Sequence, residues 1–212
     1  MSYVNDRAIH DADAHIMETP EMLADFADPD LRDRIGRQQF AHLMVGEGAA
    51  DMFAEMRQNH NDPAYRADDG AEIMNRKNWH ATGSFLKEDR AEALDLLGFK
   101  SQLMFNTFWN AYLLDLEMGD DADLAYGAAR AHNRAMLDFC SVDRRLLAAC
   151  YVPLMDFERT AVFAAEAIKA GAKAILVPSA CPANHSPSHT GLFPLWRQAE
   201  EAGLPIVMHV GG

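Results

Sequence analysis

Residues 146–178, LLAACYVPLMDFERTAVFAAEAIKAGAKAILVP, decide the fold class of this chain. An apolar run at 146–152 is followed by a helical stretch at 157–170 that ends before Gly171, and a second apolar run begins at Ala174. Glycine directly after the last helical residue is a common helix stop. Neither apolar run alternates with polar residues, as expected for strands that are buried on both faces. The stretch therefore predicts two parallel strands joined by a helix.

The same rhythm extends in both directions from this unit. Strands are predicted at residues 8–15, 101–106, 146–152, 173–178 and 205–209, and helices at residues 87–97, 121–142, 157–170 and 192–202. A doubly wound sheet and a (β/α)8 barrel, the TIM barrel, both fit this α/β order. No Gly-x-Gly-x-x-Gly motif follows the first strand and no P-loop motif is present, which argues against dinucleotide and phosphate-loop folds.

Residues 40–85 interrupt the rhythm. They are rich in Met, Asn, His, Asp and Gly, and only residues 49–57 have a clear helical pattern. We interpret residues 40–85 as an insertion that forms a lid, a dimer arm or both.

Composition narrows the class of protein. The chain has 212 residues, with 19 Lys and Arg against 32 Asp and Glu, a formal net charge of −13 and 49% hydrophobic residues. This is a globular composition, and the acidic charge argues against nucleic acid as a partner. No run approaches the roughly 20 apolar residues of a membrane helix, and the N-terminus lacks a signal-peptide pattern. The three cysteines form no C-x-x-C pair, so we expect a reduced, cytoplasmic protein.

The first predicted strand carries Asp11-Ala12-Asp13-Ala14-His15, followed by Glu18. Residues two apart in a strand point to the same face, so Asp11, Asp13 and His15 are expected to project together. Buried carboxylates need a compensating positive charge, and Asp and His are ordinary ligands of Zn²⁺ and Mn²⁺. The motif predicts a divalent metal site. The alternative is that Asp11 and His15 only cap the end of a strand.

The far end of the chain supplies a second candidate ligand. Residues 204–212, LPIVMHVGG, predict an apolar strand that ends in His209. In (β/α)8 enzymes the active site lies at the carboxyl ends of the strands, which is the position of His209. The alternative is a histidine held by a loop carbonyl.

Three further residues are candidates for substrate contact. Asn106 ends the second strand, Trp109 follows closely, and His185 lies in a loop rich in Pro and Ser after the fourth strand. Plain packing of Trp109 and a solvated loop around His185 are the alternatives. We interpret His132 as a surface or helix residue.

Several stretches resemble one known family. DADAHIMETPEML (11–23) resembles the metal-binding first strand of the amidohydrolase superfamily, in particular the amidohydrolase-related branch that includes aminocarboxymuconate-semialdehyde decarboxylase. ARAHNRAMLDFCSVDRRLLAACYVPLMD (129–156), GAKAILVPS (171–179) and LFPLWRQAEEAGLPIVMHVGG (192–212) resemble later elements of that branch. The resemblance covers most of the chain in the same order, apart from residues 40–85.

The resemblance implies a metal-dependent (β/α)8 barrel, of which residues 1–212 hold the N-terminal five strands as part of one domain. Asp13 and His15 match the His-x-His ligand positions of the first strand, and His209 matches the strand-five ligand. We expect Zn²⁺. Asp13 stands where many members have His, and an acidic residue there often accompanies a harder metal, so Mn²⁺ is the alternative. The family's strand-six His and strand-eight Asp, which include its catalytic acid/base, are expected beyond Gly212.

The same resemblance implies an enzyme. We expect a metal-dependent hydrolase of a small carboxylated or cyclic substrate. The alternative is a carboxy-lyase, a non-oxidative decarboxylase of a hydroxy-aromatic or muconate-like acid. A second alternative is a non-catalytic barrel fragment that serves as an interaction module. The expected partners are a small-molecule substrate and a second copy of the chain in a homodimer, with no nucleic acid and no membrane.

Overall fold

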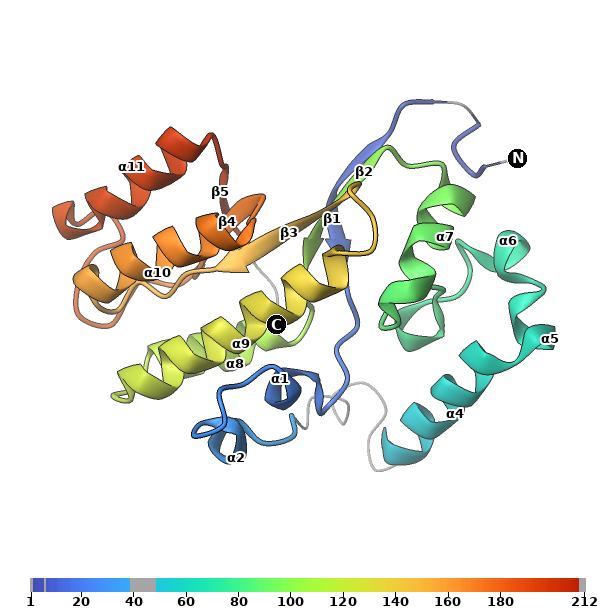
Figure 1. Cartoon of the computed structure of the whole chain (residues 1–212), viewed down its shortest axis with the longest axis horizontal. Helices are drawn as coiled ribbons and strands as arrows, with labels where there is room; N and C mark the ends of the chain where they lie inside the picture. Colours follow the sequence, from blue (N-terminus) through green and yellow to red (C-terminus); the bar gives the residue numbers. More distant parts are fainter. Residues whose placement is uncertain (1, 6, 39–48, 210–212) are drawn as a thin grey trace.

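A curved parallel sheet forms the centre of the computed structural model, which describes residues 2–5, 7–38 and 49–209 (Figure 1). Its strands pair in chain order as a half-barrel. They are β1 (His10–His15), β2 (Ser101–Phe105), β3 (Leu146–Tyr151), β4 (Ala174–Val177) and β5 (Ile206–Met208). All four strand pairs are parallel. The predicted strands and their order as part of a TIM barrel are confirmed.

Helices follow the strands and cover one face of the sheet (Figure 1). They are α7 (Lys87–Leu97), α8 (Trp109–Glu117), α9 (Ala122–Cys140), α10 (Phe157–Ala170) and α11 (Phe193–Ala202), the last preceded by the 3₁₀ turn η3 (Thr190–Leu192). The predicted bounds of α7 and α10 are confirmed, and α9 and α11 differ by one or two residues at their ends. Sequence analysis did not predict α8, whose N-cap residue Phe108 offers no capping side chain.

Local signals explain where the regular helices begin and end. The carboxylates of Asp121 and Asp156 accept hydrogen bonds from backbone amides in the first turns of α9 and α10. Gly98, Gly171 and Gly203 end α7, α10 and α11 in the left-handed backbone conformation, which glycine adopts without a side-chain penalty. These caps satisfy helix-end groups that otherwise need water.

The N-terminal third adds short helices beside the barrel wall. They are α1 (Met22–Asp25), α2 (Arg32–Ile35), α4 (Ala49–Asn61), α5 (Pro63–Arg66), α6 (Asp69–Glu72) and η2 (Asn78–His80). Of the predicted insertion, residues 40–48 all lie outside the described residues. Phe53, Met56 and Trp79 are buried in the same hydrophobic core as the sheet. The described part of 40–85 therefore packs against the barrel wall, and its role as a lid or dimer arm stays a prediction.

The core lies between the sheet and its helices. All four residues of β4 are buried, as are five of the six residues of β3, in agreement with their unbroken apolar sequences. The small residues Ala128, Ala131 and Ala135 of α9 are also buried and belong to this core. Among the described residues, no helix is both long enough and apolar enough to cross a membrane.

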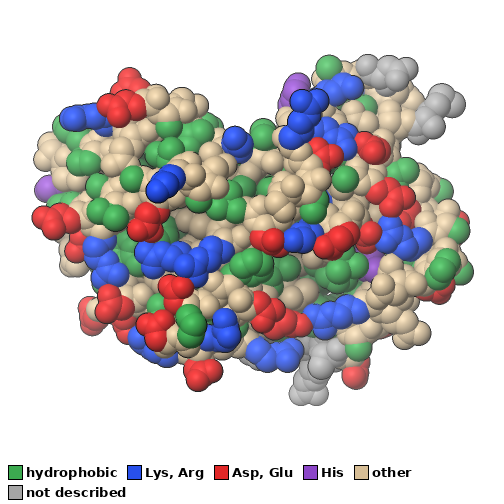
Figure 2. Space-filling model, in the orientation of Figure 1, with side chains coloured by type: hydrophobic (Ala, Val, Ile, Leu, Met, Phe, Trp, Pro, Cys, Tyr) green, Lys and Arg blue, Asp and Glu red, His purple; other side chains and the backbone are tan. Residues whose placement is uncertain are grey.

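The surface carries interspersed charges. Figure 2 shows Lys and Arg side chains next to Asp and Glu side chains over the face that it draws. Ion pairs among the described residues include Arg134 with Asp28 at 2.6 Å and Arg159 with Asp123 at 2.9 Å. Such exposed pairs contribute little stability individually.

Candidate metal centre

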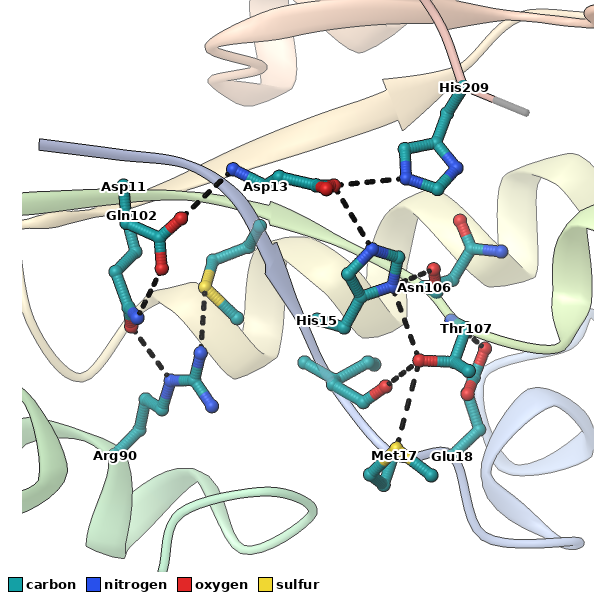
Figure 3. Close-up of polar contacts among 12 residues, drawn as sticks. Asp11, Asp13, His15, Met17, Glu18, Arg90, Gln102, Asn106, Thr107 and His209 are labelled. Carbon is teal, nitrogen blue, oxygen red and sulfur yellow. Dashed lines mark hydrogen bonds and ion pairs between the residues drawn. The ribbon is translucent and has the colours of Figure 1, made fainter. Parts of the chain in front are cut away.

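The carboxyl ends of β1 and β5 bring three predicted ligands together (Figure 3). Asp13 Oδ1 lies 3.2 Å from His15 Nε2 and 3.0 Å from His209 Nε2. One ligand atom from each residue lies within 4.8 Å of the other two, and we call Asp13, His15 and His209 the ligand group. His209 is separated from Asp13 by 196 positions in the sequence, so the curvature of the sheet produces this contact.

The hydrogen-bonding roles of these side chains fit a cation. His15 Nδ1 lies 2.8 Å from the backbone carbonyl oxygen of Asn106. A carbonyl oxygen can only accept, so Nδ1 carries the hydrogen and the lone pair of a neutral His15 ring is on Nε2, facing Asp13. That lone pair and a carboxylate oxygen repel each other unless a proton or a metal ion lies between them. One carboxylate and two imidazoles are suitable donors for Zn²⁺ or Mn²⁺, so the residues fit a divalent ion.

The ionisation of Asp13 agrees with a ligand role. Partial burial alone would raise its pKa, but the neighbouring His209 and His15 side chains outweigh that effect and hold the pKa below its ordinary value. The Asp13 side chain is 72% exposed, compared with 29% for His15 and 18% for His209. The carboxylate is therefore charged at neutral pH and open to solvent.

Asp11 does not join this group. The pairing of β1 with β2 shifts register between Asp11 and Ala14, and such a shift interrupts the two-residue alternation of a strand. Asp11 Oδ1 instead accepts a hydrogen bond from the backbone amide of Asp13 at 3.0 Å, and Oδ2 accepts one from Gln102 at 3.1 Å. The prediction that Asp11 projects with Asp13 and His15 is therefore wrong. Asp11 fixes the backbone that presents Asp13.

A buried arginine, Arg90, is linked to Asp11 through the side chain of Gln102 (Figure 3). Arg90 is 8% exposed, and its Nε donates to Gln102 Oε1 at 3.0 Å while Nη1 donates to the carbonyl of Gly83 at 3.2 Å. Burial lowers the pKa of Arg90 to about 10, so the guanidinium remains charged at neutral pH. Arg90, Gln102 and Asp11 thus form a continuous chain of hydrogen bonds that ends at the amide of Asp13.

Glu18 anchors the segment that orients His15. Its Oε1 accepts backbone hydrogen bonds from Thr107, Phe108 and Trp109 at 2.8, 2.9 and 3.1 Å, at the start of α8. Glu18 is fully buried, and burial raises its pKa to about 7. The Thr107 hydroxyl lies 3.3 Å from His15 Nδ1. The position of Glu18 three residues after His15 was the only sequence signal of this role.

The three residues that were predicted to contact substrate differ in burial and in their partners. Asn106 and Trp109 are fully buried, and both contact His132 of α9: Asn106 Oδ1 lies 3.1 Å from His132 Nε2, and the Trp109 ring packs edge-on at 5.6 Å. His185 Nε2 lies 2.8 Å from the carbonyl of Leu154. His132 is a helix residue as predicted, but it is fully buried, and burial lowers its pKa to about 4. The backbone carbonyl of Asn106, and not its side chain, contacts His15 of the ligand group.

A cavity of about 200 Å³ adjoins the ligand group and shares His209 with it. Its other walls come from α8 and from the ends of β3 and β4, and include Asn110, Tyr151 and Ser179. Sequence analysis did not identify these residues, because no short motif distinguishes them.

Comparison with known proteins shows the family and the fold of this chain. Residues 10–212 match the family model described as Amidohydrolase. An amidohydrolase from Mycobacterium avium subsp. paratuberculosis K-10 superposes with a TM-score of 0.70 at 19% identity, over 97% of this chain and 58% of that one. The 5-carboxyvanillate decarboxylase of Novosphingobium aromaticivorans DSM 12444, complexed with manganese and 4-hydroxy-3-methoxy-5-nitrobenzoic acid, gives 0.53 at 18%, over 97% and 51%. The chain thus spans between half and three fifths of these relatives. No curated protein matches.

Proposed function

The chain belongs to the amidohydrolase family, and from this premise we propose that it contributes the metal-binding wall of a metal-dependent enzyme. Asp13, His15 and His209 would hold one divalent ion, Zn²⁺ or Mn²⁺. The observation that carries this proposal is the convergence of one carboxylate and two imidazoles from β1 and β5, within 4.8 Å of one another. Exposed acidic groups alone are common, but here two imidazole nitrogens also face the same carboxylate oxygen, an arrangement that a bound cation would stabilise.

The protein residues have separate tasks in this proposal. When bound, a divalent ion supplies a Lewis acid that polarises a substrate oxygen and lowers the pKa of coordinated water. Asp13 balances the charge, and the Asn106 carbonyl fixes the tautomer of His15, as outer groups commonly do at metal sites. Asp11 holds the backbone of Asp13. These groups preorganise the site before any ligand arrives.

We propose hydrolysis of a small carboxylated or cyclic substrate as the reaction. Decarboxylation of a small aromatic or muconate-like acid is the second candidate. Two observations support decarboxylation as a candidate. The ligand group includes an oxygen donor suited to Mn²⁺. The cavity beside His209 has largely apolar walls that suit a ring. The manganese-bound decarboxylase shares the fold of this chain.

Metal analysis tests the ligand assignment. The purified protein should carry about one divalent ion per chain, and the double variant His15→Ala/His209→Ala should carry none. His80→Ala, which removes an exposed histidine, is the matched control and should keep the ion. Stoichiometric metal in the double variant would refute the assignment.

Turnover separates the candidate reactions. The protein loaded with Zn²⁺ or Mn²⁺ would be offered amides, esters and lactones that bear a carboxylate, and separately hydroxy-aromatic acids. Release of a new carboxylate supports hydrolysis, and release of CO₂ supports decarboxylation. Bound metal with neither product would instead favour the non-catalytic alternative.

A further inference from the structure

The loop after β4, residues 178–189, contains a histidine whose two ring nitrogens both face carbonyl oxygens. His185 Nε2 lies 2.8 Å from the carbonyl oxygen of Leu154, which follows β3, and His185 Nδ1 lies 3.0 Å from that of Ser186. A carbonyl oxygen can only accept a hydrogen bond, so both nitrogens must carry a hydrogen for both bonds to form. Only the positively charged ring, the imidazolium, has hydrogens on both nitrogens.

Neighbouring groups favour this charge. Leu154 connects His185 to a buried carboxylate, because its backbone amide donates to Glu117 Oε1 at 2.6 Å while its carbonyl faces His185. Burial raises the pKa of Glu117, whereas its hydrogen bonds and the charge of His185 act in the opposite direction. The ring of Phe157 lies 4.5 Å from the His185 ring, centroid to centroid, and aromatic faces attract cations.

The second histidine of the loop has the opposite preference. His189 Nδ1 accepts a hydrogen bond from the backbone amide of Gly191 at 3.0 Å, so this nitrogen carries a lone pair and the ring is neutral. The His189 ring lies 5.9 Å from the His185 ring and stacks on Phe157 at 4.6 Å. Two positive charges at that separation would repel each other. The contacts of this pair therefore place its proton on His185.

The ionisable groups around His185 and its partners come from the strand, the helices and the loop that surround it. They are Glu117 of α8, Tyr151 of β3, Asp156 at the N-cap of α10, and Cys181 and His189 of the loop. Tyr151 donates its hydroxyl to Glu117, and Asp156 accepts the backbone amide of Arg159. His185 is half-buried and its loop is largely exposed, so its ring exchanges protons with solution.

We propose that His185 is a pH-sensitive latch for residues 178–189: the doubly protonated ring fixes this loop to the end of β3, and loss of one proton loosens it. A neutral ring keeps one hydrogen bond but turns a lone pair toward the other carbonyl oxygen, which disfavours the latched conformation. The loop begins with Pro178 and Ser179, which line the cavity beside His209, so loosening changes one wall of that cavity. The latch depends neither on a metal ion nor on the reaction proposed above.

NMR spectroscopy of the full chain, labelled with ¹⁵N and treated with EDTA, tests the latch. Spectra of the ring nitrogens report how many hydrogens His185 carries. Amide hydrogen exchange, corrected for its intrinsic pH dependence, reports the protection of residues 179–189. We expect this protection to fall about tenfold between about pH 5 and about pH 8, the effect of one hydrogen bond, with the same midpoint as the loss of a hydrogen from His185.

Three variants separate the latch from other titrating groups, and all of them retain His15 and His209. His185→Phe has no donor, so its loop should be about tenfold less protected than the wild-type loop at about pH 5 and should not change with pH. His185→Arg supplies charged donors at every pH, so its loop should stay protected at about pH 8. His189→Gln, the matched control in the same loop, should keep the wild-type dependence.

Circular dichroism would verify that each variant is folded. Protection that does not depend on pH in the wild-type protein would overturn the proposal. So would a dependence that persists unchanged in His185→Phe, because another group would then control the loop. Loss of the dependence in His189→Gln would likewise overturn it, because His189 would then be the titrating residue.

Discussion

The buried carboxylate of Glu18 should make the stability of this protein depend on pH, and Glu18→Gln should remove that dependence. Oε1 accepts three backbone amides, whereas Oε2 has no partner among the described residues. The pKa of about 7 in the folded chain lies above the ordinary value of 4.5, chiefly because burial disfavours the charge. Glu18 therefore contributes most to stability below pH 4.5, and its contribution falls until the pH passes about 7.

The size of this effect follows from the two pKa values. A difference between 4.5 and about 7 in a fully buried group corresponds to about 3 kcal/mol in the free energy of unfolding. Glutamine retains an oxygen for the three amides and cannot ionise. The wild-type protein should therefore lose about 3 kcal/mol relative to Glu18→Gln between pH 4.5 and pH 8.

Urea unfolding followed by circular dichroism at several pH values measures this difference. Metal-free protein is used, so that metal uptake does not contribute. Subtracting one protein from the other cancels every other titrating group. Glu201→Gln, a change at an exposed carboxylate, is the matched control and should show no such trend. A difference between wild type and Glu18→Gln that stays constant across the pH range would refute the reasoning.

Four other predictions concern the supports of the sheet and site. Gly83 has a φ of +69°, and an added Cβ would lie 2.7 Å from Arg90 Cα, so Gly83→Ala should cost about 3 kcal/mol or more in urea unfolding. Gly171→Ala, at φ +109° with open space around it, should cost only about 1 kcal/mol. Thr107→Val removes a hydroxyl beside the ligand group and should weaken metal binding about tenfold by calorimetric titration. Asp156→Ala should cost about 1 kcal/mol in thermal unfolding, and Asp156→Asn should restore it.

The sheet was largely predictable because its signals are local. Strands buried on both faces are continuous apolar runs, and α10 begins at an Asp156 cap and ends before Gly171. The start of α8 was not predictable in this way. Its capping carboxylate belongs to Glu18, about 90 positions earlier, so no nearby residue marks the helix.

The predictable part of the candidate site is the set of residues whose type and spacing indicate a ligand role. The spacing of Asp13 and His15 and the position of His209 indicated a ligand group, but the register shift after Asp11 leaves no trace in a strictly alternating pattern. Asn110 and Tyr151 could not be identified from the sequence, because their place beside the cavity depends on residues that only the fold brings next to them. The dimer, the cytoplasmic location and the lid stay predictions, since each concerns partners or surroundings outside the described residues.

The contact between Asp13 and His209 bears on the order of folding events. It joins residues 196 positions apart, and contacts of such separation form slowly because the entropy of loop closure must be overcome first. The helices and the β2–β3 pairing depend on much shorter separations. We therefore expect the ligand group to assemble late, and we expect detachment of β5 alone to abolish it while most of the core stays intact. Capture of an ion there would act as a cross-link between the first and last strands of the sheet.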